Sequence, residues 1–302
     1  MIIRLLGVAP LVAALLLVSC VGEGEPRPDL VLVSTRDGDY ALYEMNAEGG
    51  SQTRLTENEN GIDSSPQRIF FQVDPAWSPD GKRIAFASRR AGTFDIYVMN
   101  ADGTGTRRLT STKGHDTHPT WSPDGSQIAF ARSEPGDIYV MNADGSDARR
   151  ISDPEAEESE PAWSPDGSRI AYVKRTAGTS VRELWLLQPD GSDRRALTSL
   201  KAVSYTPAWS PDGMRIAFAS NAGGPLLDIY TVGVDGKGVR RLTRTGPDAF
   251  EPAWSPDGST IAFSRDGSII TIDLEGNEAE LTDSDNNDSS PAWNPVPPPK
   301  EE

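Results

Sequence analysis

The sequence predicts an all-β fold, a six-bladed β-propeller in which each blade is a four-stranded sheet. First, six of the seven tryptophans recur at intervals of 39 to 46 residues, and a period of about 40–45 residues is typical of propeller blades. Second, the 302 residues include 28 Gly and 24 Pro, which favours short strands and tight turns over long helices. Third, one end of the chain supplies three strands of a blade and the other end supplies one.

The first strand of each blade comes from the motif Pro-Ala-Trp-Ser-Pro-Asp-Gly. It occurs at 75–81, 161–167, 207–213 and 252–258, with a Thr variant at 119–125. Pro-Ala-Trp ends the strand, and Ser-Pro-Asp-Gly places Pro, Asp and Gly where a type I turn prefers them. We therefore assign the aspartates to turns and the tryptophans to packing between blades.

Three more strands follow in each unit. The second has the pattern Ile-Ala-Phe, the third Asp-Ile-Tyr-Val and the fourth Arg-Arg-Leu-Thr, each with variants. β-branched and aromatic residues in short runs support strands. The fourth strand forms the outer edge of the blade, where paired arginines discourage edge-to-edge association.

The chain ends predict how the ring closes. Residues 30–56 supply the second, third and fourth strands, at Leu30–Ser34, Leu42–Asn46 and Thr53–Thr56, without a first strand before them. Trp293 supplies a first strand with nothing after it. Pairing of the two ends completes a sixth blade and removes open sheet edges. The propeller thus spans 30–295, followed by a Pro-rich polar tail at 296–302.

Residues 1–19 are predicted to be a lipoprotein signal peptide. Arg4 precedes an apolar stretch, and Leu17-Val18-Ser19-Cys20 resembles a bacterial lipoprotein signal in which the cysteine is acylated. An ordinary secretory peptide with an incidental cysteine is the alternative. Residues 20–29 would form a tether. We expect a membrane-anchored extracytoplasmic protein, on the periplasmic face of the outer membrane if the cell has one, because residue 21 is Val rather than Asp.

The repeats resemble the WD40-like (PD40) repeats of TolB-type propellers, and related repeats occur in prolyl-oligopeptidase and dipeptidyl-peptidase propellers. The likeness covers nearly all of residues 30 to 295. It implies the fold more strongly than a function, since these residues build blades. TolB carries an α/β domain before its propeller; since about ten residues separate Cys20 from the first strand, we expect that domain to be absent. The peptidases would need a hydrolase domain with a Gly-x-Ser-x-Gly elbow, which the sequence lacks.

Loop lengths point to one face for recognition. The loops from the second to the third strand vary in length, and the first connection between blades carries an insertion of ten residues within 57–74. Both lie on the same face of the ring, called here the loop face; the turns joining strands one and two, and three and four, lie on the opposite turn face. Variable loops on a rigid scaffold are common binding sites.

Acidic residues just before the first strands are expected at the mouth of the central channel, where they would bind a cation or a basic segment of a partner. Solvated loop acids are the alternative. The residues so placed are Asp74, Asp116, His118, Glu158, Glu160, Asp248, Glu251 and Asp288.

Oxygen ligands alternate in the stretch 283–288, so Asp283, Asp285 and Asp288 are candidate ligands for Ca²⁺, although the Gly and distant Glu of an EF-hand are missing. Apart from Ca²⁺, no cofactor is expected. The two histidines, His115 and His118, share one loop, and no activated nucleophile is visible. A net charge of −16 excludes binding to nucleic-acid backbones.

Two functions fit these observations. The first is a non-enzymatic, lipid-anchored propeller that binds an envelope protein or peptide through its loop face. The alternative is a metal-dependent carbohydrate-active enzyme, a lyase or hydrolase, that uses the channel mouth. An acidic, histidine-poor mouth counts against anionic polysaccharide substrates.

Overall fold

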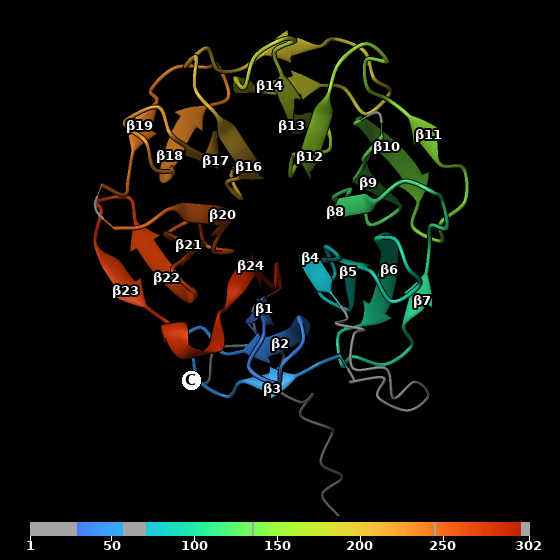
Figure 1. The fold of residues 1–302 in the computed structure, drawn as a ribbon, viewed down its shortest axis with the longest axis vertical. Helices are drawn as coiled ribbons and strands as arrows, with labels where there is room; N and C mark the ends of the chain where they lie inside the picture. The colour runs from blue at the N-terminus through green and yellow to red at the C-terminus, as the bar shows by residue number, and fades with distance from the viewer. Residues whose placement is uncertain (1–28, 57–70, 135, 245, 297–302) are drawn as a thin grey trace, which may run out of the picture.

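The computed structural model describes residues 29–56, 71–134, 136–244 and 246–296. It confirms the all-β propeller: six four-stranded antiparallel sheets form a ring (Figure 1), and the cavities at its centre form a channel. No α-helix occurs in the described parts of the chain, and so no helix there could cross a membrane. The predicted leader, Cys20 and most of the tether lie outside the described residues, as does most of the 57–74 insertion.

Each blade has its first strand beside the channel and its fourth at the rim. The first strands are β4 (Gln72–Trp77), β8 (Asp116–Trp121), β12 (Glu158–Trp163), β16 (Ser204–Trp209), β20 (Ala249–Trp254) and β24 (Ser289–Trp293). The second strands are β1 (Leu30–Ser34), β5 (Arg83–Ser88), β9 (Gln127–Arg132), β13 (Ile170–Arg175), β17 (Arg215–Ser220) and β21 (Thr260–Arg265).

The outer strands are shorter toward the rim. The third strands are β2 (Ala41–Met45), β6 (Asp95–Asn100), β10 (Asp137–Asn142), β14 (Arg182–Leu187), β18 (Asp228–Gly233) and β22 (Ser268–Asp273). The fourth are β3 (Thr53–Arg54), β7 (Arg107–Arg108), β11 (Arg149–Arg150), β15 (Arg195–Ala196), β19 (Arg240–Arg241) and β23 (Glu278–Glu280). Blade 1 is β24-β1-β2-β3, and blades 2 to 6 follow in chain order from β4. A 3₁₀ turn, η1 (Ser284–Asn286), precedes β24.

Blade 1 closes the ring as predicted. The C-terminal strand β24 pairs antiparallel with β1, with Leu30 opposite Trp293 and Val31 opposite Ala292. The Trp77 indole Nε1–H of blade 2 donates to the carbonyl of Ala292 at 3.1 Å. The last strand is therefore bonded within its own blade and to the next one.

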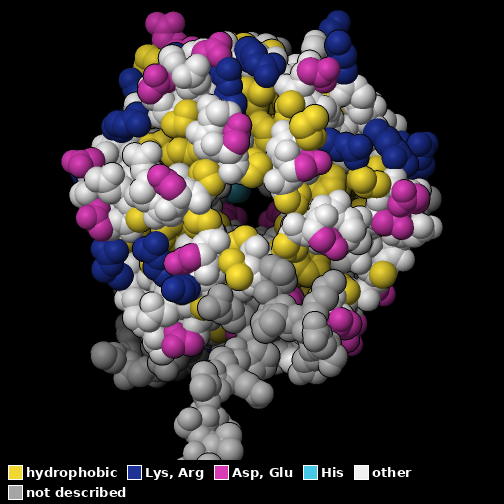
Figure 2. All heavy atoms as spheres, turned by 180° about the vertical axis from the view of Figure 1, so that it is seen from behind, with side chains coloured by type: hydrophobic (Ala, Val, Ile, Leu, Met, Phe, Trp, Pro, Cys, Tyr) yellow, Lys and Arg dark blue, Asp and Glu magenta, His cyan; other side chains and the backbone are white. Residues whose placement is uncertain are grey.

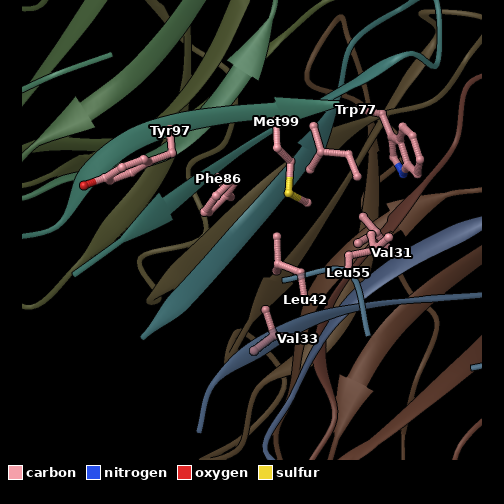
Figure 3. Packing of buried hydrophobic residues seen from close by; sticks show 9 residues of the cluster. Val31, Val33, Leu42, Leu55, Trp77, Phe86, Tyr97 and Met99 are labelled. Atoms are coloured by element: carbon pink, nitrogen blue, oxygen red, sulfur yellow. The ribbon is translucent and has the colours of Figure 1, made fainter. Parts of the chain in front are cut away.

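The cores lie between neighbouring blades. Between blades 1 and 2, Val31, Val33, Leu42 and Leu55 face residues of blade 2 (Figure 3). The residues of blade 2 in this cluster are Trp77, Ile84, Phe86, Tyr97 and Met99. Each blade thus buries its apolar faces against its neighbours, and the motif tryptophan is part of that packing.

The Ser-Pro-Asp-Gly segments form closed hydrogen-bonded turns. In blade 3 the Ser122 hydroxyl donates to Asp124 at 2.6 Å, and the Ser126 amide donates to the same carboxylate at 3.0 Å. These donors hold the pKa of Asp124 below its ordinary value. The same serine–aspartate bond recurs in the other motif turns.

We expect deletion of residues 286–302 to lower the free energy of unfolding by at least about 3 kcal/mol, because β1 and Trp77 lose the strand that packs beside them. Thermal unfolding followed by circular dichroism measures the change, with deletion of 297–302 alone as the control. Equal unfolding midpoints for both deletions and the intact chain would show that β24 does not hold the ring together.

We expect Asp124→Ala to destabilise the protein by about 1 kcal/mol at neutral pH, since one turn loses its acceptor. The pKa of Asp124 is lower in the folded state, so its contribution is present above pH 3.8 and is lost as the pH falls through the folded-state pKa. Urea unfolding at several pH values tests this, with Glu275→Ala, an exposed turn-face acid, as the control. A stability difference that does not shrink in acid would contradict it.

Candidate functional site

Near the loop face, six residues at equivalent positions line one cavity of the channel. Each is the third residue before the motif tryptophan, immediately precedes a proline, and lines a cavity of about 160 Å³ together with those prolines. We call this set the channel ring; its members are Asp74, His118, Glu160, Thr206, Glu251 and Ser290.

Every residue of the channel ring has the same unusual backbone. The φ angles lie between 49° and 55°, in the left-handed region, although none is glycine. Each first strand also shifts register against its neighbour at this point, which is the signature of a β-bulge. Bulges redirect side chains, and a non-glycine residue in this region costs on the order of 1–3 kcal/mol. The fold thus holds all six side chains at the channel by a strained backbone.

Acidic residues alternate around the ring. Asp74, Glu160 and Glu251 belong to blades 2, 4 and 6, whereas His118, Thr206 and Ser290 belong to blades 3, 5 and 1. The ring therefore has approximate threefold symmetry in its charge.

Each acid is held by the next blade. The backbone amide of His118 donates to Asp74 at 3.1 Å, that of Thr206 to Glu160, and that of Ser290 to Glu251 at 2.7 Å. The hydroxyls of Ser264 and Ser290 also donate to Glu251, at 2.7 and 2.9 Å. These bonds join blade 2 to 3, 4 to 5 and 6 to 1, and they fix the carboxylates around the channel.

Burial and the neighbouring charges change the pKa values of His118 and Glu160 in the channel ring. Burial lowers the pKa of His118, but the carboxylates of Asp74, Glu160 and Glu251 together outweigh burial, so this pKa lies above its ordinary value. Nδ1 of His118 is 3.5 Å from Asp74 Oδ2. Burial also raises the pKa of Glu160, and the nearby His118 offsets only part of that rise.

Thr206 adds an unsatisfied polar group. Its hydroxyl oxygen is buried and has no hydrogen-bond partner among the described residues. A buried hydroxyl without a partner costs about 1–3 kcal/mol, so a ligand that bonds to it gains part of that energy.

The opposite end of the channel is apolar. A second cavity of about 430 Å³ opens toward the turn face and is lined mainly by Pro, Ala and Trp of the motif. Figure 2 shows this hydrophobic rim, with acidic and histidine side chains visible deeper in the channel. The channel thus changes from polar to apolar along its axis.

Three of the expected mouth residues lie elsewhere, which corrects the sequence-based placement. Asp116, Glu158 and Asp288 are at most 1% exposed and form ion pairs inside the blades. Asp116 pairs with Arg132 at 2.6 Å, Glu158 with Lys174 at 3.3 Å, and Asp288 with Arg36 at 3.1 Å. Asp116 and Glu158 face these cations directly across the strand pair, so the bulge that turns the channel ring inward leaves them within the sheet.

Asp248 is also placed outside the cavity. It precedes β20, and its carboxylate accepts the Leu227 amide at 2.6 Å. Of the eight expected mouth residues, Asp74, His118, Glu160 and Glu251 line the cavity. Sequence reasoning missed Thr206 and Ser290, although their place before the motif proline would have identified them.

The candidate calcium ligands are not brought together. Asp283 caps η1 and accepts the Asp285 amide at 3.3 Å, whereas Asp288 is buried against Arg36. Within the described ranges, no group of three His, Cys, Asp or Glu side chains is placed to hold a metal ion.

We expect Asp74→Asn to lower the pKa of His118, since it removes one of the charges that favour the imidazolium. With two histidines in the chain, an NMR titration of the ring protons can follow each one. The raised pKa also means that His118 stabilises the fold below about pH 6.5, and that this contribution is lost as the pH rises through its folded-state value. An unchanged titration of His118 in the variant would contradict this electrostatic account; Glu155→Gln, an exposed acid on the loop face, is the control.

Comparison with known proteins places this geometry in a family. The family model described as the TolB beta propeller domain matches residues 68–183 and 159–296. A 78-residue stretch is 32% identical to the Tol-Pal system protein TolB of Thioalkalivibrio sulfidiphilus, covering 24% of this chain and 18% of that protein. The chain thus matches less than a quarter of the length of such curated relatives.

Solved structures agree on the fold. TolB from Acinetobacter baumannii superposes with a TM-score of 0.76 at 21% identity, over 88% of this chain and 66% of that one. An oligogalacturonate lyase in complex with manganese superposes with a TM-score of 0.54 at 15% identity, over 85% of this chain and 74% of the lyase. At these identities the structures show a shared fold and nothing more. Because the family model spans most of the sequence, from blade 2 to the closing strand, this chain belongs to the TolB β-propeller domain family.

Proposed function

We propose that this protein is a lipid-anchored, extracytoplasmic binding module whose channel ring takes a positively charged group of an envelope protein or peptide. The single observation that carries the proposal is the alternation of three carboxylates around a small cavity. The TolB-like fold supports a role in binding, and the signal-like segment ending at Cys20 supports the anchor and the periplasmic location.

The geometry of the ring favours an ammonium group. A lysine side chain or a chain N-terminus carries three N–H donors on one nitrogen. Three acids, one each from blades 2, 4 and 6, line the cavity. An ammonium entering along the channel axis can therefore direct one N–H to each carboxylate. Hydrogen bonds to charged partners contribute about 1.5–3 kcal/mol each.

The ring is prepared for such a ligand before it arrives. Each acid is already oriented by a backbone amide of the next blade, so little side-chain freedom is lost on binding. The unpaired hydroxyl of Thr206 offers a hydrogen-bonding group to another polar atom of the ligand.

The carbohydrate-active alternative has weaker support. It draws on the fold shared with oligogalacturonate lyase at 15% identity, and a shared fold does not imply a shared activity.

We expect the combined variant Asp74→Asn, Glu160→Gln and Glu251→Gln to capture at least tenfold less partner from detergent-solubilised envelopes than the unchanged chain. The expected loss follows from removing three charged acceptors while keeping their size. Capture is quantified by mass spectrometry, and acetylation of lysines and N-termini in the envelope extract should reduce it equally. Circular dichroism verifies that the variant is folded.

Glu155→Gln is the matched control, since Glu155 is exposed on the loop face outside the ring. Capture should also weaken as the pH falls, because His118 gains positive charge and Glu160, whose pKa is raised, loses its negative charge at a higher pH than an ordinary glutamate. Undiminished capture by the triple variant would overturn the assignment of the site to the channel ring.

A further inference from the structure

A second candidate site lies on the turn face, at the seam between blades 5 and 6. It is a cleft of about 520 Å³, and its lining includes Asp212, Met214, Arg215, Lys237, Arg240 and Leu274. Figure 2, which views this face, shows Lys and Arg side chains grouped beside hydrophobic ones over the blade of β16 to β19.

The cleft lies at the turn-face end of the seam, where the turn after β22 stands away from its neighbour. In blades 1 to 5, a Cβ atom on the glycine of the turn between the third and fourth strands would fall within 3 Å of a carbonyl oxygen of the preceding blade. At Gly276, the glycine of blade 6, such an atom would meet nothing within 4 Å. The turn between the third and fourth strands is thus packed against the preceding blade in five blades and stands apart from it in blade 6, although the core between blades 5 and 6 is buried.

An interblade hydrogen bond is missing at the same seam. The first arginine of the fourth strand donates to the next blade's turn in three places: Arg107 to Asp144 O at 2.7 Å, Arg149 to Pro189 O at 3.2 Å and Arg195 to Val234 O at 3.0 Å. Arg240, at the equivalent position in blade 5, has no such partner among the described residues.

Arg215 is also freer than its counterparts. Arg83 lies over the Trp121 ring at 4.5 Å, and Arg169 pairs with Asp193 at 2.6 Å. Arg215 is exposed and forms no ion pair within the described part of the chain. Its nearby acid, Asp212, is engaged in the motif turn, where it accepts from Ser210 and from the Met214 amide.

Lys237 completes the set of cations. Its side chain is 86% exposed, and the nearest carboxylate, Asp235, is 3.9 Å away. A pair this long and exposed contributes little. Three cations therefore face solvent across one cleft, whose lining includes one carboxylate, that of Asp212, in a chain whose net charge is −16.

The cleft also exposes apolar surface. Met214, which lines the cleft, is 63% exposed. The residue after the motif glycine is polar in the other four complete units, Lys82, Ser126, Ser168 and Ser259, so Met214 is the exception. Cations beside an exposed methionine form an amphiphilic surface, which suits a ligand with an anionic head and an apolar body.

We propose that this cleft contacts the anionic surface of a phospholipid membrane, with Arg215, Lys237 and Arg240 binding headgroup phosphates and Met214 entering the apolar boundary. Arginine pairs with phosphate through two parallel N–H bonds. The choice of a membrane rests on the anchor in the proposed function: Asp29, where the tether meets β1, bonds to Asn294 on the turn face. A chain from Cys20 to Asp29 spans at most about 30 Å, which would keep this face near the bilayer.

The test is co-sedimentation of residues 21–302, which include every described strand, with vesicles. Equal parts of phosphatidylcholine and phosphatidylglycerol are compared with phosphatidylcholine alone at low ionic strength. We expect binding to the anionic vesicles, weakening as salt rises. Arg215→Gln with Arg240→Gln should reduce it about 25-fold, since each cation near an anionic surface contributes about fivefold.

The matched control is Arg169→Gln with Arg195→Gln, which removes the same charges from the equivalent positions of blade 4 and should change binding less than twofold. Equal losses in both double variants, equal binding to the two vesicle types, or no binding would overturn the proposal. Equally tight binding of soluble glycerol phosphate would show an anion site without a membrane role. Because the chain tested lacks the anchor and keeps the channel ring, these outcomes are independent of the capture experiment.

Discussion

The structure depends on one constraint: no blade can bury its apolar faces alone. Val31 and Leu42 of blade 1 need Trp77 and Met99 of blade 2, and the same dependence runs around the ring. Such a chain of neighbours leaves two exposed faces unless its ends meet. The pairing of β24 with β1 supplies that meeting, and hydrophobic burial, hydrogen-bonded edges and the central channel all follow from it.

Much of this architecture could be predicted from the sequence because it is local and repeated. The residues that determine the Ser-Pro-Asp-Gly turn are four consecutive ones, and the incomplete units at the two ends of the chain predict how the ring closes. The site was only partly predictable. Asp116 and His118 are two residues apart and would share a face in a regular strand, but the bulge before Pro119 separates them into a buried ion pair and a channel residue. The pattern of hydrophobic residues along the strand does not indicate that a bulge reverses the side on which the following side chains lie.

The two ends of the channel and the turn-face cleft divide the molecule by polarity. Carboxylates gather near the loop face, the motif tryptophans and prolines surround the other opening, and three exposed cations lie at one seam. In a chain of net charge −16, this distribution favours one orientation next to an anionic surface. Such a surface repels most of the molecule and attracts the turn-face cleft. Orientation can therefore arise from charge placement without any specific partner.

The backbone of the channel ring has a consequence for how such proteins diversify. Because proline and the bulge fix the main chain at six places, the side chain placed there can change without rebuilding the blade; this chain already carries Asp, His, Glu, Thr and Ser at equivalent positions. The fold thus provides six equivalent positions around one small cavity, and the residue at each position can vary. Randomising those six codons would give a compact library of channel chemistries on a single fold.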